Sequence, residues 1–141
     1  MLFSITSDSR GHDRRSLVYM VDSVGEQRGM HYYNFSLVSG LDESGVDVVL
    51  ISTSETATHP LKPTNVEVRD GFRGIYRRGP MWVRGIRYAF SLLRIGWWAM
   101  NDRPEIAHFH FFQIPILDWA LILFLEQPGV RVVTTIHDVV P

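Results

Sequence analysis

Three histidines near the C-terminal end of the chain are of a residue type that can do chemistry at a binding site. His108 and His110 belong to one apolar run, and His137, followed by Asp138, closes the next run. Histidine can donate a hydrogen bond from either ring nitrogen and can carry a positive charge near neutral pH. His137 could therefore bind a ligand hydroxyl or stabilise charge that develops during a reaction. The alternative is a structural histidine whose nitrogens are satisfied by its neighbours.

The spacing of His108 and His110 also bears on metal binding. Two residues apart on one strand, their side chains share a face and could ligate one ion. A zinc site needs more ligands, however, and no third one is evident nearby in a chain that has no cysteine. We therefore expect no metal, with His108 as a hydrogen-bonded core residue and His110 close to the ligand.

Residues 105–141 contain the elements that would position these histidines. An apolar run at 106–111, a segment opened by a proline at 115–127 and a β-branched run at 131–137 predict strand, helix and strand. Such a unit forms a parallel pair with a right-handed crossover. Ligands of these sheets bind outside the carboxyl ends of the strands, so His110, His137 and Asp138 are expected at that edge.

A second strand–helix–strand unit is expected in the N-terminal half. A strand at 17–21 leads into a loop with Gly25 and Gly29, a helix over 30–44 and a strand at 46–52. A loop that feeds a helix N-terminus can present backbone N–H groups to an anion, which makes both glycines candidate ligand-binding positions. Their spacing is not G-x-G-x-x-G, which disfavours a nicotinamide-dependent oxidoreductase. A turn that needs glycine backbone angles is the plainer alternative.

Together with a loop over 53–65 and a short strand at 66–68, these elements predict an α/β fold, a Rossmann-like doubly wound parallel sheet. The domain would occupy residues 17–141 and follow a polar lead-in at 1–16. No internal repeat and no linker to a second domain is evident within the chain.

The helix expected over residues 80–101 is unusual because it combines arginines with many aromatic residues. Arg84, Arg87 and Arg94 gather on one side of the helical wheel, and Arg77 and Arg78 precede the helix. A basic stripe beside a broad apolar face is typical of a helix that lies on an anionic membrane surface. The same arginines disfavour a membrane-spanning helix. The alternative is a crossover helix that packs on the sheet with its arginines in water.

The composition limits the classes of protein to consider. The chain has 141 residues, 45% of them hydrophobic, which is enough for one packed domain. A net charge of −1 argues against nucleic acid as a partner. The lack of cysteine and of a recognisable signal peptide fits a cytoplasmic protein, and the arginine-rich helix could place it on the inner face of the membrane.

Three motifs resemble the N-terminal domain of retaining GT-B glycosyltransferases of the large family four. Residues 134–141 (TTIHDVVP) resemble its Thr-x-His-Asp-x-x-Pro stretch, and residues 104–111 (PEIAHFHF) resemble the Pro-Asp-x-x-His-x-His strand before it. Residues 29–33 (GMHYY) and the helix that follows are similar to its first loop and helix. The chain departs from the pattern in its separated glycines, where many members have adjacent ones, and in its longer lead-in.

The resemblance implies a two-domain enzyme with its site in the cleft between the domains. This domain would bind a glycan or lipid-linked acceptor, and a C-terminal domain would bind the nucleotide-sugar donor, as in cell-surface polysaccharide or glycolipid synthesis. His137 would lie beside the transferred sugar, with the Gly25–Gly29 loop near the diphosphate. The family needs no metal and no cofactor besides the nucleotide-sugar.

The donor-binding domain is not among these residues. We therefore expect the chain alone to be inactive and to need its missing C-terminal domain or a partner subunit. A rival hypothesis is a non-catalytic α/β binding or adaptor module that docks on a membrane or a partner chain through helix 80–101.

Overall fold

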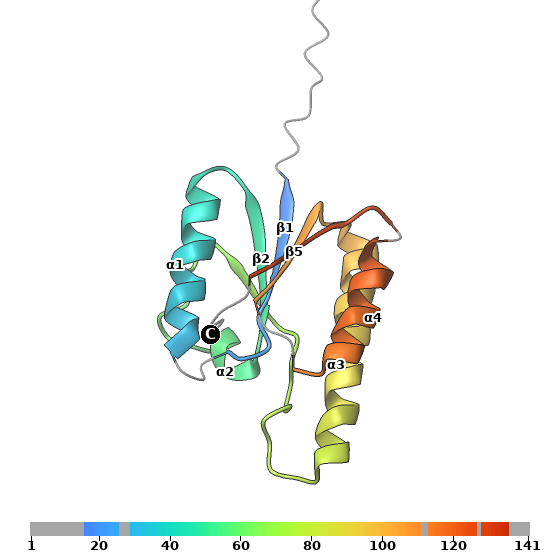
Figure 1. The fold of residues 1–141 in the computed structure, drawn as a ribbon. Coiled ribbons are helices and arrows are strands. Elements are labelled where there is room, and N and C mark those ends of the chain that lie inside the picture. Colours follow the sequence, from blue (N-terminus) through green and yellow to red (C-terminus); the bar gives the residue numbers. More distant parts are fainter. Residues whose placement is uncertain (1–15, 26–28, 111–112, 127, 136–141) are drawn as a thin grey trace, which may run out of the picture.

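The computed structural model describes residues 16–25, 29–110, 113–126 and 128–135. Its centre is a five-stranded sheet with the strand order β3-β2-β1-β4-β5 (Figure 1). All neighbouring strands are parallel. The strands are β1 (Leu17–Val21), β2 (Asp47–Ser52), β3 (Glu67–Asp70), β4 (Ile106–Phe109) and β5 (Arg131–Thr134). This arrangement confirms the predicted α/β doubly wound sheet.

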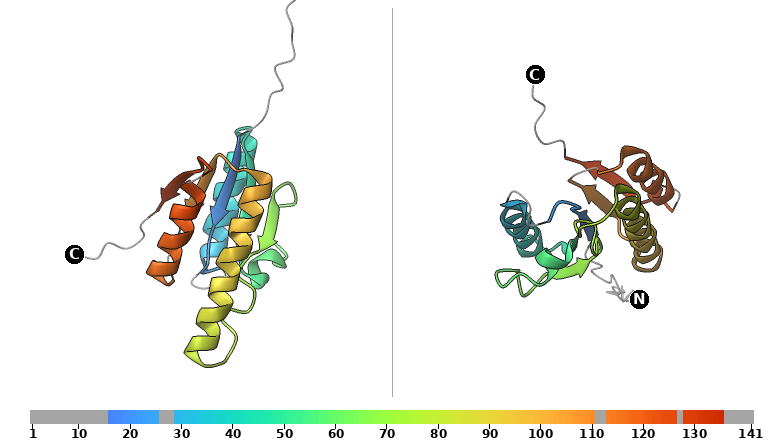
Figure 2. Two further views of the ribbon diagram at one scale, coloured as in Figure 1. Left: turned by 90° about the vertical axis from the view of Figure 1, so that its right-hand side faces the viewer. Right: turned by 90° about the horizontal axis from the view of Figure 1, so that it is seen from below.

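Four helices flank the sheet: α1 (Met30–Glu43), α2 (Ser54–Ala57), α3 (Met81–Asp102) and α4 (Pro115–Glu126). α1 covers one face, and α3 and α4 lie side by side on the other (Figures 1 and 2). Each face has its own core because successive strand residues point to opposite sides. Tyr19 of β1 packs with Ile95 and Leu121 under α3 and α4, whereas the next residue, Met20, packs with Phe35 under α1.

The element boundaries differ from the predicted ones in several places. β3 begins and ends later than the predicted 66–68 strand, and the short helix α2 lies within the predicted 53–65 loop. β4 ends at Phe109 rather than at residue 111. β5 ends at Thr134, and the rest of the strand predicted to residue 137 lies partly outside the described residues.

Asp118 shows why α4 starts where it does. This residue lies in the first turn of the helix. It is buried, and its Oδ2 accepts a hydrogen bond of 3.0 Å from the backbone N–H of Ile114, while the Tyr88 hydroxyl donates to its Oδ1. The carboxylate thus satisfies an N–H group at the helix start that has no partner within the helix.

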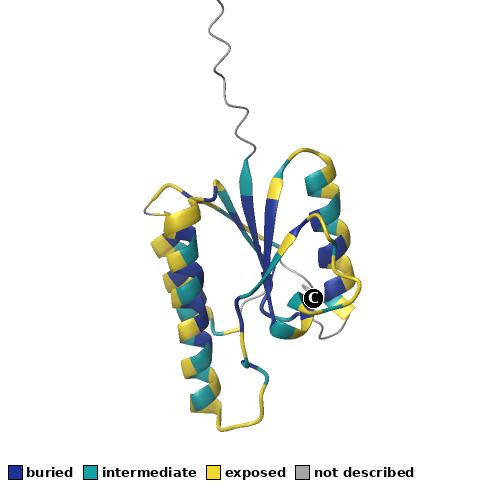
Figure 3. Ribbon diagram, turned by 180° about the vertical axis from the view of Figure 1, so that it is seen from behind, coloured by how far each residue is buried: buried dark blue, intermediate teal, exposed yellow. Residues whose placement is uncertain are grey.

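α3 is much longer than the strands and projects past the carboxyl edge of the sheet. In Figures 1 and 2 its first turns and the preceding loop extend below the ends of the strands. Tyr88, Leu92, Ile95 and Ala99 bury one side of the helix. Exposed residues recur along its outer side, which Figure 3 shows in yellow. Within the described ranges, no helix is both long enough and apolar enough to cross a bilayer.

Candidate functional site

The chain connections of this sheet diverge at the carboxyl ends of β1 and β4, and we refer to this switch point as the crevice. β1 leads to α1 on one face, and β4 is reached from α3 on the other face. Ligands of doubly wound sheets bind at such a switch point. Five buried polar residues lie at or directly after the ends of the central strands here: Asp22, Ser23, Ser52, Thr53 and His110.

Asp22 organises the crevice, and sequence reasoning missed it. The residue is fully buried directly after β1, and its Oδ1 accepts a hydrogen bond of 2.9 Å from Val24 N–H. Its Oδ2 accepts from Gly25 N–H at 3.1 Å and from Asn34 Nδ2 at 2.6 Å. Burial raises the pKa of Asp22, and these hydrogen bonds counteract part of the rise. An aspartate between a buried strand and a glycine loop was the available signal, because Asp commonly accepts from the backbone two residues on.

Gly25 has a structural explanation in addition to its predicted role. Its φ angle of 65° lies in the left-handed region, and a Cβ atom there would be 2.2 Å from Thr53 Oγ1. Its N–H group already donates to Asp22, so that group is not directed at a ligand. The glycine allows the loop to turn tightly against Thr53, and its contact with a substrate stays a prediction.

Gly29 differs because it borders open space. It is the N-cap of α1 with φ 71°, and a Cβ atom there would meet nothing within 4 Å. Among the described residues, which exclude 26–28, no side chain caps the helix start, and the first turn contains no acidic residue. The N-terminal end of α1 therefore keeps backbone N–H groups and a positive dipole end that could receive an anion.

His110 stands at the carboxyl end of β4, as the sequence predicted. Its side chain is 2% exposed, and its ring centroid is 5.7 Å from that of Tyr33 on the first turn of α1. His108 is partly buried, and its Nε2 is 2.6 Å from Thr135 Oγ1, in agreement with a hydrogen-bonded histidine. His137 and Asp138 lie outside the described residues.

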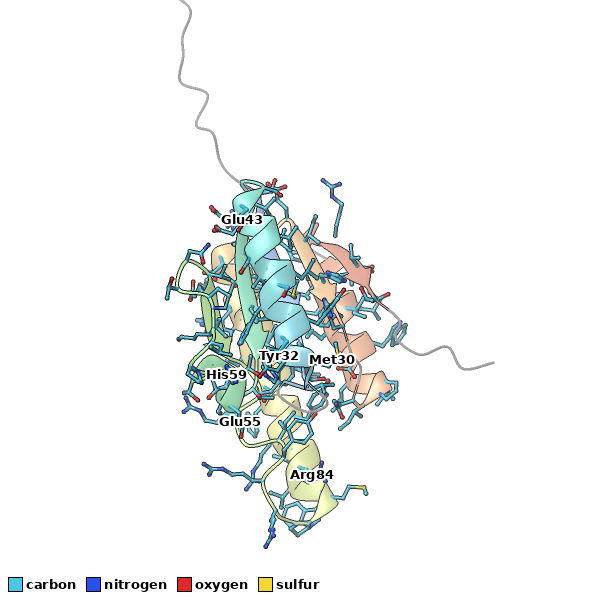
Figure 4. The ribbon with its side chains drawn as sticks, turned by 90° about the vertical axis from the view of Figure 1, so that its left-hand side faces the viewer. Met30, Tyr32, Glu43, Glu55, His59 and Arg84 are labelled. Carbon is cyan, nitrogen blue, oxygen red and sulfur yellow. The ribbon has the colours of Figure 1, made fainter. Side chains whose placement is uncertain are left out.

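Two further polar residues on α1 were not singled out from the sequence. His31 is 7% exposed, and its ring centroid lies 4.6 Å from that of His59, which follows α2, with the two rings tilted by 43°. Figure 4 shows Met30, Tyr32 and His59 together at this end of the molecule. Within the part of the chain that the structure describes, both ring nitrogens of His31 and Oδ1 of Asn34 are buried without a hydrogen-bond partner. Among those residues, no cluster of three or more potential metal ligands occurs.

The arginines of α3 turn toward the loop that follows β3. Arg84 Nε donates to the carbonyl oxygen of Ile75 at 3.1 Å, Arg87 Nη1 to that of Gly74 at 3.3 Å, and Arg94 Nη2 to that of Gly71 at 3.0 Å. The helical wheel placed them correctly on one side, but this side contacts the 71–75 loop. Arg77 and Arg78 are exposed.

The outer side of α3 is apolar instead, and it continues onto α4. Between the two helices lies a groove of about 390 Å³, lined only by apolar residues and glycine. The large exposed apolar side chains are Met81, Trp82, Ile86, Phe90, Leu93, Trp97 and Met100 of α3, and Ile116, Trp119, Leu123 and Phe124 of α4. We call this surface the α3/α4 apolar face. Large exposed apolar surfaces on a protein mark interaction sites.

Comparison with known proteins identifies the family. The sequence profile of Glycosyltransferase Family 4 matches residues 27–141. The chain belongs to this family. The match includes Gly29, His110 and the 134–141 motif, and confirms the family that the motifs indicated. The crevice described above is thus part of a glycosyltransferase domain.

Solved structures share the fold of this family 4 domain at low sequence identity. MurG of Acinetobacter baumannii superposes with a TM-score of 0.58 at 12% identity, over 85% of this chain and 34% of MurG. The chain therefore spans about a third of the length of MurG. A UDP-galactose 4-epimerase (TM-score 0.46, 14% identity, 84% of this chain and 54% of that one) also matches. Phenylacrylic acid decarboxylase of Aquifex aeolicus matches with a TM-score of 0.44 at 13% identity, over 85% of this chain and 81% of that one. Comparison with curated proteins gives no match.

Proposed function

We propose that this domain binds the acceptor in a transfer of a sugar from a nucleotide-sugar to a glycan or a lipid-linked acceptor. The observation that carries the proposal is the start of α1 at Gly29, which no described side chain caps. The first turn of this helix lies next to His110 at the switch-point crevice. A helix start of this kind suits the diphosphate of a sugar donor. Membership in family 4 supplies the reaction class.

The reaction breaks the bond between the anomeric carbon and a phosphate oxygen, and the nucleoside diphosphate leaves with the electron pair. The acceptor hydroxyl oxygen forms the new glycosidic bond and loses its proton. In our proposal the first-turn N–H groups of α1 stabilise the charge that grows on the diphosphate. His137 hydrogen-bonds the transferred sugar, and His110, Gly25 and Asp138 shape the space for it.

The donor site lies on another domain or on a partner subunit in this proposal. This domain would contribute only the start of α1, which meets the diphosphate, and the nucleoside and the sugar of the donor would be bound mainly by that other part. The 141-residue chain alone would bind ligands weakly and would not turn over. No metal and no further cofactor takes part, because the positive end of α1 offers the diphosphate a favourable electrostatic partner.

We further propose that the domain works on the cytoplasmic side of a membrane. Support comes from the α3/α4 apolar face and from the exposed Arg77 and Arg78 next to it. Residues 71–101 contain six arginines and no acidic residue, which favours an anionic lipid surface. The same face supports the second candidate, a non-catalytic adaptor.

One experiment separates the two candidates. The complete reading frame that encodes these residues is expressed, and release of nucleoside diphosphate from UDP- and GDP-sugars is followed with membranes as the acceptor source. We expect His137→Ala to lower turnover about 100-fold while the unfolding temperature stays unchanged. His12→Ala, in the lead-in, is the matched control and should have no effect. Unchanged turnover in His137→Ala would overturn the catalytic role, and absence of any release would favour the adaptor.

A further inference from the structure

A smaller pocket, of about 250 Å³, opens beside the crevice on the α3 side of the sheet. Its walls come from the loop after β3, the first two turns of α3 and the segment before α4. Tyr76, Arg84 and Gln113 contribute polar groups to it. Ile75, Met81 and Ile114 contribute apolar surface. The mixed lining suits a ligand with one charged group and an apolar part.

Arg84 is the charged group of this pocket, and its position is fixed. Its Nε donates to the Ile75 carbonyl oxygen at 3.1 Å, which holds the plane of the guanidinium. Among the described residues, Arg84 has no acidic partner, and its two terminal amino groups make no hydrogen bond to the protein. A guanidinium held in this way presents a fork of donors that matches two oxygens of a phosphate. Figure 4 shows Arg84 on the projecting part of α3.

Tyr76 and Gln113 line the pocket as neutral polar groups. The Tyr76 hydroxyl donates to the carbonyl oxygen of Ser23 at 2.8 Å and accepts from Gln113 Nε2 at 3.0 Å. Burial, reinforced by the negative charge of Asp22, raises the pKa of Tyr76 to about 12, so the phenol carries no charge near neutral pH. The second N–H of the Gln113 amide can still donate to a ligand oxygen.

The surroundings favour an anion with an apolar part. None of the described residues that line the pocket is acidic, and Arg77 and Arg78 nearby in the chain are exposed. Their positive field attracts anions to this end of α3. Met81, which lines the pocket, is 86% exposed, and the next residue, Trp82, is 68% exposed. An apolar chain attached to the anion could lie over both side chains.

The pocket adjoins the proposed reaction site. Tyr76 bonds to Ser23, which directly follows Asp22, so the pocket borders the crevice opposite the start of α1. We infer that this pocket binds a phosphate ester carried by the acceptor, with Arg84 as its anion anchor. This inference rests on the proposed function, because the ligand is an acceptor only if the protein transfers a sugar. The phosphate could belong to a lipid or to a soluble sugar phosphate.

Binding of two probes to the purified full chain, measured by calorimetry without any donor, tests this inference. The probes are dihexanoyl phosphatidylglycerol below its micelle concentration and glucose 1-phosphate. We expect Arg84→Gln to weaken binding about tenfold, because a charge-assisted pair is lost. Arg131→Gln makes the same charge change at an exposed site at the start of β5, outside the pocket lining, and should change binding little. Tighter binding of the lipid probe assigns the phosphate to a lipid, and equal binding assigns it to a soluble ester.

A second variant at Arg84 and two other results test the proposed phosphate site further. Arg84→Lys keeps the charge but not the fork, so it should bind less tightly than the wild type and more tightly than Arg84→Gln. It also replaces the Gln variant if that variant does not fold, as judged by its unfolding temperature. Equal weakening by Arg84→Gln and Arg131→Gln, or no binding of either probe, overturns the inference. A confirmed phosphate site in a protein that transfers no sugar overturns only the proposed function.

Discussion

Asn34 donates a hydrogen bond of 2.6 Å to the carboxylate of Asp22, and this contact ties the first helix to the loop after the central strand. Both residues are fully buried. The same carboxylate accepts from the N–H groups of Val24 and Gly25, so one side chain fixes the loop and the direction of α1 together. The geometry of the crevice therefore depends on a contact between residues 12 positions apart.

Asp22→Ala should destabilise the protein by about 2–4 kcal/mol, because it leaves buried N–H donors without an acceptor. Asn34→Ala should cost less, about 1–2 kcal/mol, since the carboxylate keeps its backbone donors. The free energies of unfolding would be measured in urea, with Glu43→Gln, an exposed carboxyl at the end of α1, as the control. Equal stability of Asp22→Ala and the control would contradict this role of Asp22.

Substitution of the two loop glycines should have unequal effects. Gly29→Ala adds a Cβ atom that has no described neighbour within 4 Å. The loss of stability should therefore come only from the strain of alanine in the left-handed backbone conformation, about 1–2 kcal/mol. Gly25→Ala has the same backbone cost and in addition a Cβ atom 2.2 Å from Thr53 Oγ1, so we expect a larger loss. Comparison of the two midpoints of urea unfolding checks the difference, and Gly29→Ala serves as the control for Gly25→Ala. Equal midpoints would mean that Thr53 moves aside freely.

The stability of the domain should fall in acid partly because of Asp102, at the end of α3. Burial alone would raise its pKa, but hydrogen bonds from Tyr19 and Arg69 and the charge of Arg69 lower it below its ordinary value of 3.8. A carboxyl with a lowered pKa in the folded state stabilises it above its ordinary pKa and loses that contribution as the pH falls below it. Asp102→Asn should therefore be less stable than wild type at pH 7, and the difference should shrink below about pH 4. A pH series of urea unfolding curves measures it, and a constant difference would contradict the prediction.

The α3/α4 apolar face should carry the contact with a membrane. Replacing Trp82 and Trp97 with alanine should lower the partitioning of the protein onto phosphatidylglycerol vesicles by about 100-fold or more, because each buried aromatic side chain contributes about 1.5–3 kcal/mol. Co-sedimentation with the vesicles gives the partition coefficient. Tyr32→Ala is the control, since Tyr32 is also exposed but lies on α1. If the control loses as much binding as the double variant, the contact does not depend on this face.

Chelation of divalent metal should leave the sugar transfer of the complete enzyme unchanged. The reason is the proposed pairing of the leaving diphosphate with the positive end of α1, which does not require a cation. Turnover would be compared before and after EDTA and dialysis, with added Mg²⁺ as the control. Loss of turnover that Mg²⁺ restores would contradict a metal-free mechanism.

The sequence by itself determined the order of the elements and the family. Apolar and β-branched runs, separated by glycine and proline, are local signals, so strand β1 and helices α1, α3 and α4 lie close to where they were expected. The parallel sheet followed from the alternation of strands and helices. The positions of Gly25, Gly29 and His110 at the carboxyl edge followed from the direction of the strands.

The tertiary structure decided which partner each polar side chain has. Asp22 meets Asn34 and Ser52, Arg94 meets Gly71, and Tyr76 meets Ser23, across separations of 12 to 53 residues. No local pattern encodes such pairs, because they depend on how helices pack on the sheet. For the same reason, the helical wheel placed the arginines of α3 on one side of the helix but could not show that they hydrogen-bond to the 71–75 loop. The apolar side of the helix thereby became an exposed face, whereas Arg87 and Arg94 are half-buried and only Arg84 of these three arginines is exposed.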